Sequence, residues 1–282
     1  MSVATHALTL GHSPDPDDAF MFYALATHKI DTEGLEFTHI LQDIETLNRR
    51  ALNAELDITA ISFHAYAYVS EKYALLSSGA SMGDRYGPIV VAKKNLTKDQ
   101  LLRSSIAIPG TMTSAYLALR LCIGRFNYTV IPFDQIIEAV VRGKVDAGLI
   151  IHEGQLTFAG HGLLNVLDLG AWWTEQTNGL PLPLGANVIR KDLGTQIMAK
   201  ANRIVRLSIQ YGLEHRDEAV KYAMQWGREL DQGLTDRFVG MYVNDLTLDY
   251  GERGRAGVVE FLKRACGQGV IPQQTTPEFL SD

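Results

Sequence analysis

A histidine stands at the end of the apolar run Ala147 to Ile151, which the sequence predicts as a buried strand. Glu153 and Gly154 follow His152 at once. In an open α/β sheet, ligands bind just beyond the carboxyl ends of the strands. The unperturbed pKa of a histidine suits it for moving protons near neutral pH. His152 is therefore a candidate for proton transfer to or from a ligand, although a histidine that only caps the strand by bonding a backbone carbonyl fits this position equally well.

The turn after the first predicted strand, Gly11 to Asp18, also carries polar residues. Its two prolines stiffen the turn and place Ser13 at the edge of the sheet, where it would contact a ligand. Ordinary turn and N-cap chemistry is the competing explanation, above all for Asp15 and Asp18.

Two further turns combine hydroxyl and aromatic residues after predicted strands. Ser62-Phe63-His64 ends one strand, and the turn from Pro109 to Ala115 joins another to a helix. A hydroxyl here is explained well enough as an N-cap, yet free N–H groups and hydroxyls at a helix start also bind carboxylate or phosphate. The substrate-binding residues that we predict are Ser13, Ser62, Phe63, His64, Thr111, Thr113 and Ser114.

Strands and helices alternate through the first two thirds of the chain. The predicted strands are 7–11, 35–41, 58–63, 87–92, 105–108, 130–133, 147–151, 163–167 and 186–189. The predicted helices are 17–28, 44–52 with Asp43 as N-cap, 64–73, 113–123, 135–142, 234–243 and 254–265. A polar loop is expected at 81–86, and a Trp-rich loop after Leu167.

This order of elements predicts an α/β fold of two lobes with a ligand cleft between them. The stretches Val90 to Lys94 and Val188 to Lys191 look alike, since each is an apolar strand that runs into basic residues. We take them as the two crossings between lobes. Residues 1–92 plus 189–282 would then form the first lobe, and residues 93–188 an inserted second lobe.

Composition restricts the partners. The chain has 282 residues, 46% of them hydrophobic, and a formal net charge of −6, which argues against nucleic acid or an anionic membrane as the main partner. No basic, apolar leader begins the sequence, and no run approaches the roughly 18 apolar residues of a membrane span. We expect a cytoplasmic protein that binds a small molecule; its oligomeric state is left open.

Common cofactor motifs are missing. The sequence has no G-x-G-x-x-G after the first strand, no phosphate-binding G-x-x-x-x-G-K-[ST] and no G-x-S-x-G nucleophile elbow. Neither its eight histidines nor its two cysteines show metal-ligand spacing. We predict no cofactor and no metal ion.

Taken together, four segments resemble a known family. They are His12 to Phe20, Ile61 to Tyr66, Ile108 to Tyr116 and Gly148 to Thr157, and the likeness extends over nearly the whole chain. They look like the 1,4-dihydroxy-6-naphthoate synthases of the futalosine route to menaquinone. The His-Glu-Gly-Gln-Leu-Thr motif is the most specific part. One departure is visible: where the family's first turn usually reads Ser-Pro-Cys-Pro-Asn-Asp-Thr-Phe, this chain has Asp15, Asp17 and Ala19 in place of Cys, Asn and Thr, which adds acid near the expected cleft.

The resemblance implies a fold like that of type II periplasmic binding proteins and a lyase that converts cyclic dehypoxanthinyl futalosine to 1,4-dihydroxy-6-naphthoate. It implies His152 as the proton acceptor, and Ser62 to His64 with Thr113 and Ser114 as substrate contacts. A non-catalytic solute-binding protein for a small aromatic carboxylate is the alternative, because fold alone does not determine function. A paralogue that acts on another aromatic carboxylate is a third option.

Overall fold

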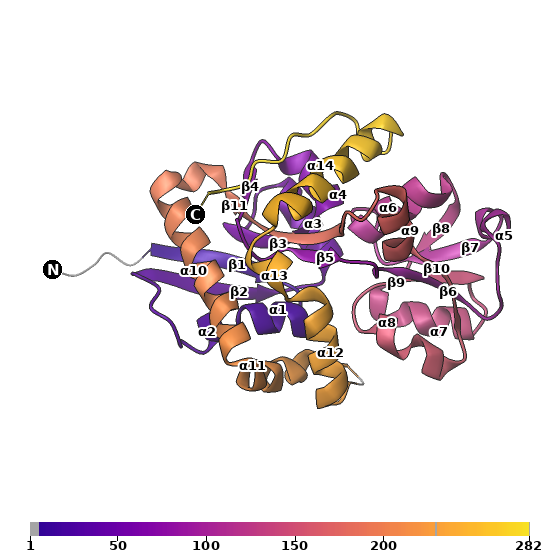
Figure 1. The fold of residues 1–282 in the computed structure, drawn as a ribbon, viewed down its shortest axis with the longest axis horizontal. Helices are drawn as coiled ribbons and strands as arrows, with labels where there is room; N and C mark the ends of the chain where they lie inside the picture. Colours follow the sequence, from indigo (N-terminus) through magenta and orange to yellow (C-terminus); the bar gives the residue numbers. More distant parts are fainter. Residues whose placement is uncertain (1–5, 229, 282) are drawn as a thin grey trace.

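Two β-sheets, each with helices packed on it, form the framework of the computed structural model, which describes residues 6–228 and 230–281 (Figure 1). In the first sheet the strand order is β2-β1-β3-β11-β4, and β5 also pairs with β11. These strands are β1 His6–His12, β2 Leu35–Leu41, β3 Ile58–Ser62, β4 Tyr73–Leu75, β5 Ser81–Gly83 and β11 Leu182–Arg190.

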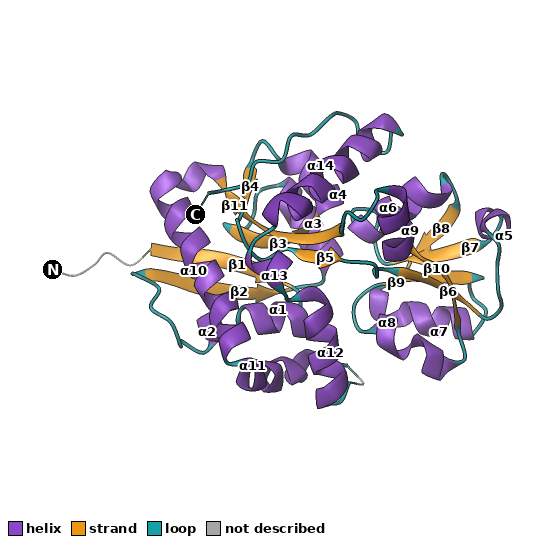
Figure 2. Cartoon of the chain, in the orientation of Figure 1, coloured by secondary structure: helices purple, strands orange, loops and turns teal. Residues whose placement is uncertain are grey.

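The second sheet has the order β10-β6-β9-β7-β8. Its strands are β6 Ile89–Ala92, β7 Ser105–Ile108, β8 Asn127–Val130, β9 Ala147–Ile150 and β10 Leu164–Asp168. Strands β1 and β3 run parallel, as do β7 and β9, so each sheet has a row of carboxyl ends at one edge. The two sheets lie at opposite ends of the molecule, and each is the centre of one lobe (Figure 2).

Helices from both ends of the chain cover the first sheet. They are α1 Pro16–Met21, α2 Tyr23–Ala26, α3 Ile44–Leu52, α4 Phe63–Val69, α10 Thr195–Glu214, α11 Arg216–Ala223, α12 Gln232–Tyr242, α13 Asp245–Leu248 and α14 Gly251–Gly267. The second lobe contains α5 Lys98–Leu102, α6 Ser114–Ile123, α7 Ile136–Val141, α8 Gly154–Thr157 and α9 Leu169–Gln176. Short 3-10 turns lie at Phe133–Gln135, Phe158–His161, Lys191–Leu193 and Met224–Trp226. Within the described residues, every helix is too short or too polar to cross a bilayer.

One apolar core runs from lobe to lobe. It joins Ile61 of the first sheet and Leu262 of α14 to Leu117 of α6 and Ile106 of the second sheet, all fully buried. The lobes are therefore held together by buried apolar surface on one side, because removing such surface from water is the main force that stabilises a fold.

The changes of sheet do not fall at the two predicted crossings. Strand 89–92 pairs with β9 and β10, so it belongs to the second sheet, whereas all of β11 pairs within the first. The chain changes sheet at 84–88 and returns at 177–181. The predicted boundaries at Ala92 and Ile189 are wrong because the resemblance of the two stretches is local, while sheet membership depends on distant partners.

Several predicted elements are confirmed, and others are corrected. Strand 35–41 and helix 44–52 have the predicted bounds, and the Asp43 side chain accepts a hydrogen bond from the Thr46 N–H as N-cap. The predicted helix 64–73 ends at Val69, and the polar loop 81–86 contains β5. The strand expected at 130–133 lies at 127–130, because Pro132 introduces a turn. The Trp-rich loop is helix α9, capped by Asp168. Residues 1–5, at which a leader would begin, lie outside the described residues.

Candidate functional site

A pocket with about 690 Å³ of empty space lies between the lobes, where the carboxyl ends of β1 and β3 face those of β7 and β9. This is the expected place for a ligand in an open α/β sheet. Its polar lining includes Ser13 after β1, Ser62 at the end of β3, Thr113 and Ser114 after β7, and His152 after β9. Helix α12 contributes the rings of Phe238 and Tyr242.

The turn after β1 carries three carboxyl side chains into this pocket. Asp15 is the N-cap of α1, as its position suggested, and its Oδ1 accepts a hydrogen bond from the Asp18 N–H at 3.1 Å. Asp18 Oδ2 in turn accepts from the Ser13 N–H at 2.6 Å. Asp15, Asp17 and Asp18 are only 3%, 7% and 7% exposed. The local hydrogen bonds thus fix three acids in a buried turn.

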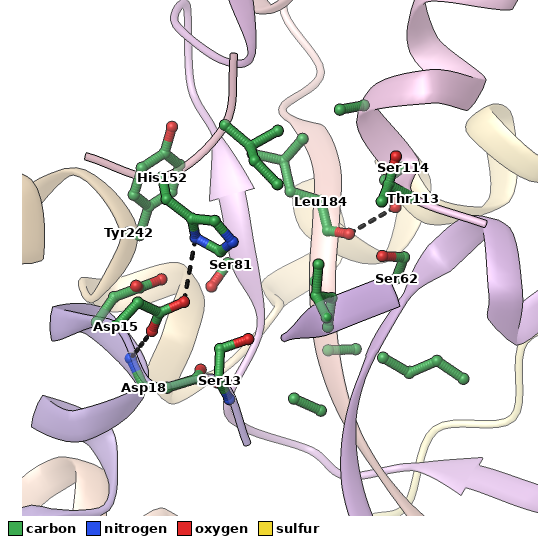
Figure 3. A pocket seen from close by; sticks show the side chains of 18 of the residues that line it. Ser13, Asp15, Asp18, Ser62, Ser81, Thr113, Ser114, His152, Leu184 and Tyr242 are labelled. Atoms are coloured by element: carbon green, nitrogen blue, oxygen red, sulfur yellow. Dashed lines mark hydrogen bonds and ion pairs between the residues drawn. The ribbon is translucent and has the colours of Figure 1, made fainter. Parts of the chain in front are cut away.

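His152 lies against this turn. Its Nδ1 is 3.1 Å from Asp15 Oδ2, and its side chain is 15% exposed. The other ring nitrogen, Nε2, faces away from Asp15 toward the middle of the pocket (Figure 3). His152 has φ of +53°, a left-handed conformation that costs free energy for a residue other than glycine. Backbone strain of this kind is often found where a functional side chain is held in position.

The pKa values of the pair reflect their contact. Burial would lower the pKa of His152, but the hydrogen bond to Asp15 and the negative charges of Asp15, Glu153 and Asp18 outweigh it, so the pKa is raised. Burial would raise the pKa of Asp15, but the hydrogen bond and charge of His152 lower it overall. Asp15 is therefore the carboxylate that orients the imidazole and stabilises its protonated form.

The other two acids differ from Asp15. Burial raises the pKa of Asp17 well above its ordinary value, and the charges of Asp15 and Asp18 raise it further. Burial and the charge of Asp15 also raise the pKa of Asp18 well above its ordinary value. We call Asp15, Asp17, Asp18 and His152 the acid–histidine wall.

Potential ligand atoms of Asp15, Asp17 and His152 lie within 4.8 Å of one another, so these three side chains are also able to hold a metal ion.

The opposite side of the pocket is formed by Ser62, Thr113 and Ser114, which we call the hydroxyl wall. Thr113 Oγ1 caps α6 by accepting from the Tyr116 N–H at 3.1 Å, and it donates to the Gly110 carbonyl at 3.0 Å. The Ser114 hydroxyl donates to the Leu184 carbonyl of β11 at 2.5 Å, which joins the two lobes (Figure 3).

Ser62 keeps a free donor. Its Oγ accepts from Asn48 Nδ2 at 3.0 Å, so its own O–H remains available to a ligand. The first N–H groups of α6, those of Ser114 and Ala115, have no intrahelical acceptor because of their position. The hydroxyl wall can therefore bind an anion mainly through backbone N–H groups and Ser62.

Three predicted contact residues lie outside the pocket lining. Phe63 is fully buried in the core, and His64, 3% exposed, packs on Tyr116 with ring centroids 6.0 Å apart. Burial lowers the pKa of His64 to about 4. Thr111 accepts a hydrogen bond from Arg49 on the exposed side of the turn. None of the three lines this pocket: helix α4 begins at Phe63 and turns the side chains after Ser62 away from it, and the Thr111 side chain bonds Arg49 instead.

Sequence reasoning missed several lining residues. The sequence does not indicate the contact of Asp15 with His152, since the two residues are far apart in the chain and the position of Asp15 is explained by its role as an N-cap. Gln155 and Tyr242 also line the pocket and share a hydrogen bond of 2.8 Å. The Gln155 amide follows His152 by three residues in the motif singled out above, so that motif was the available signal.

Solved structures with the same arrangement of lobes define the class of fold. The alkanesulfonate-binding protein SsuA from Xanthomonas axonopodis pv. citri, in a structure with bound MOPS, superimposes with a TM-score of 0.73 at 11% identity, covering 97% of each chain. The periplasmic aliphatic sulphonate binding protein SsuA from Escherichia coli gives 0.67 at 10% identity, covering 96% of each chain. The chain thus has the periplasmic-binding-protein fold, as predicted.

Sequence comparison identifies the family within that fold. The profile of a family described as "Menaquinone biosynthesis" matches residues 8–266. A 1,4-dihydroxy-6-naphthoate synthase from Thermus thermophilus is 41% identical over 97% of this chain and 99% of its own length. A synthase of the same name from Streptomyces coelicolor is 35% identical over 96% of each chain. A crystal structure of a protein from Archaeoglobus fulgidus, 49% identical, has a TM-score of 0.90 and covers 94% of this chain and 99% of its own. The chain belongs to this menaquinone-biosynthesis family, whose named members are enzymes.

Proposed function

We propose that this protein is a cytoplasmic carbon-carbon lyase that converts cyclic dehypoxanthinyl futalosine to 1,4-dihydroxy-6-naphthoate, with His152 as general base. The observation that carries the proposal is the orientation of His152. Its Nδ1 is held by Asp15 at 3.1 Å, and its Nε2 faces the pocket. With Nδ1 donating to the carboxylate, Nε2 keeps a lone pair that is able to accept a proton.

The chemistry follows from this arrangement. His152 removes a proton from the carbon next to the substrate ketone, and Asp15 stabilises the imidazolium that forms. The electron pair of the enolate then moves back, the bond to the sugar-derived fragment breaks, and the fragment leaves with the proton held by His152; aromatisation of the naphthalene pulls the reaction forward. No cofactor is needed for these steps, since the ketone itself accepts the electron pair.

The two sides of the pocket contact different parts of the substrate. The start of α6 and the Ser62 hydroxyl hold the aryl carboxylate of the substrate, and Ser13 orients a hydroxyl at the other end. Closing of the lobes around the substrate excludes water and fixes the geometry of reaction. The apolar side chains Ile44, Ile151 and Leu184 contact the rings of the substrate.

The test is incubation of purified protein with cyclic dehypoxanthinyl futalosine while naphthoate absorbance is followed. Formation of 1,4-dihydroxy-6-naphthoate that stops in His152→Asn supports the proposal. Tight binding of the substrate without turnover would favour the solute-binding protein, for which the likeness to SsuA in its complex with MOPS is the specific argument. Turnover of another aromatic carboxylate, but not of this substrate, would identify a paralogue.

A further inference from the structure

Gln155 and Tyr242 form a hydrogen bond that joins the two lobes at the pocket. Gln155 lies on α8 of the second lobe and Tyr242 on α12 of the first, and the Tyr242 O–H donates to Gln155 Oε1 at 2.8 Å. Both side chains line the pocket. Neither residue takes part in holding the carboxylate or in removing the proton, so this bond has a function beyond those two steps to explain.

The surroundings of Tyr242 determine which end of the Gln155 amide is bonded to it. Tyr242 is 4% exposed, and burial raises the pKa of its phenol, so the O–H keeps its proton near neutral pH. A buried O–H needs an acceptor, and Gln155 Oε1 is the acceptor that the described residues provide. With the amide reversed, Nε2 would face the Tyr242 oxygen and the O–H would lose that acceptor.

Nε2 of Gln155 is therefore left with two N–H donors. Among the described residues, no side chain or backbone group accepts a hydrogen bond from it, and it is not one of the buried side-chain atoms that lack a partner. Gln155 is half-buried and lines the cavity, so a ligand is able to reach these donors.

Gln155 also lies beside the proposed base. Its backbone N–H donates to the His152 carbonyl at 3.1 Å and closes a turn of four residues. The Cα atoms at the ends of such a turn are less than about 7 Å apart. Tyr242 lies on the same side of the pocket as His152 (Figure 3). One substrate molecule is therefore able to contact His152 and Gln155 together.

The reaction needs a donor at this place. Removal of a proton next to a ketone puts negative charge on the ketone oxygen, which is about 2.4 Å from the carbon that loses the proton, given bond lengths of about 1.23 and 1.52 Å. The stabilising group must thus lie near His152. The Asp15 carboxylate, 3.1 Å from His152, repels negative charge. The donor therefore has to be a group without negative charge, as the Gln155 amide is.

We propose that Gln155 is a catalytic residue that donates a hydrogen bond from Nε2 to the ketone oxygen of the substrate, and that Tyr242 is the positioning residue that orients it. This inference rests on the proposed function. As the C–H bond breaks, its proton goes to Nε2 of His152 and its electron pair moves through the carbonyl group to the oxygen. Gln155 keeps its protons and stabilises the charge that develops there. Because Tyr242 belongs to the other lobe, the amide is oriented only when the lobes are closed.

Kinetics with the proposed substrate test the donor. Gln155→Met is neutral and of similar length but has no N–H, so kcat should fall about 10²–10³-fold, the usual effect of removing one such donor, while KM changes far less. The acid limb of kcat/KM should stay in place, because no charge near His152 has changed. Gln176→Met, a matched change of an exposed residue on α9, should keep the kcat of the wild type. A normal kcat in Gln155→Met, or a loss confined to KM, would overturn the inference.

A double-mutant cycle tests the role of Tyr242. Tyr242→Phe removes only the O–H and should lower kcat about tenfold, as when a partner that orients a functional group is lost. In a Gln155→Met background the same change should have no further effect on kcat, because no amide is left to orient. An equal loss in both backgrounds would show that Tyr242 acts only on the packing of α12, and would contradict its role as the positioning residue.

Infrared difference spectroscopy tests the contact with the ketone directly. His152→Asn should bind the substrate without turnover, so the carbonyl stretch of the bound ketone can be recorded. A hydrogen bond lowers this frequency, so it should be higher in the double variant His152→Asn, Gln155→Met than in His152→Asn alone. Turnover by the wild type together with the same frequency in both variants would refute only the role of Gln155. Absence of turnover by the wild type would refute the proposed function, and with it the step assigned to Gln155.

Discussion

The two walls of the pocket are built on opposite principles. In the hydroxyl wall, Thr113 and Ser114 bond the protein's own backbone, and the group is neutral. In the acid–histidine wall, three acids and a histidine are buried together, and His152 has a left-handed backbone. The groups of the hydroxyl wall stabilise the fold, whereas the buried acids and the strained backbone of the acid–histidine wall lower its stability.

This difference indicates that one wall binds the substrate and the other carries out the chemical step. Strain and unmatched charge persist only where the rest of the structure maintains them, and they gather at sites that do chemistry. We therefore expect changes in the acid–histidine wall to affect kcat, and changes in the hydroxyl wall to affect binding or stability.

The largest effect is expected for His152→Asn. Turnover should fall by about 10²–10⁴-fold, the usual contribution of a general base, while KM changes far less. The fold should be retained, because Asn tolerates the left-handed conformation of this position better than most residues. The measurements are kcat and KM by naphthoate absorbance, with His161→Gln as the matched control. Near-normal turnover would remove His152 from the mechanism.

Asp15→Asn should have the next largest effect, through the pKa of His152. A base is inactive when protonated, so wild-type kcat/KM should fall on the acid side, below a pKa that lies above the ordinary 6.5. Without the Asp15 charge that pKa falls, and the acid limb of the profile moves to lower pH. We expect about a 10–100-fold loss of kcat at the optimum, in the range found when partners of a functional histidine are changed.

Stability distinguishes this role of Asp15 from its role as N-cap. Asn is as good an N-cap as Asp, so Asp15→Asn should keep the melting temperature of the wild type. Asp15→Ala should lose about 1 kcal/mol in the free energy of unfolding as well. An acid limb that stays in place in Asp15→Asn would show that Asp15 acts only on the helix.

The site could be predicted from sequence only in part, and the two walls show why. Thr113 as a cap of α6 and Asp43 as a cap of α3 follow from local signals, as does strand 35–41, whose residues pair along their whole length. The contact of Asp15 with His152 depends on two turns from different lobes, for which no local pattern exists.

A similar limit explains the misplaced residues and boundaries. Ser62 lies in the pocket and Phe63 does not, because the chain passes from strand to helix between them and the direction of the side chains changes. The sheet to which residues 89–92 belong is fixed by pairing with Ala147–Ile150, again a distant partner. Spacing along the chain located the turns that form the site, but it did not determine which side chains of each turn enter it.

In the hydroxyl wall, smaller and separable effects are expected. Ser114→Ala removes the bond to Leu184 that holds the start of α6, with its free N–H groups, beside the first lobe, and should raise KM by about three- to tenfold at nearly constant kcat. Thr113→Ala removes a cap and should lower the free energy of unfolding by about 1 kcal/mol. Thermal unfolding and KM are measured for both. A large fall of kcat in either variant would contradict the division between the walls.

The smallest effect is expected at the connections between the lobes, where Arg253 of α14 joins them. Its guanidinium bonds Asp84 at 2.9 and 2.6 Å and the Gly179 carbonyl at 2.9 and 2.7 Å. Asp84 and Gly179 lie in the two segments where the chain changes sheet. Arg253→Ala should loosen these segments and raise KM about two- to threefold, since an exposed ion pair contributes less than about 1 kcal/mol and the shared apolar core still holds the lobes.

A matched control separates lobe geometry from general stability. Arg203 makes a similar exposed pair of bonds to Glu33, at 3.2 and 2.6 Å, on the far side of the first lobe. Arg203→Ala should change the melting temperature as little as Arg253→Ala does, but it should leave KM unchanged. If both variants raise KM equally, the connections have no special part in binding. If only Arg253→Ala does so, the position of one lobe relative to the other contributes to binding even though neither wall has changed.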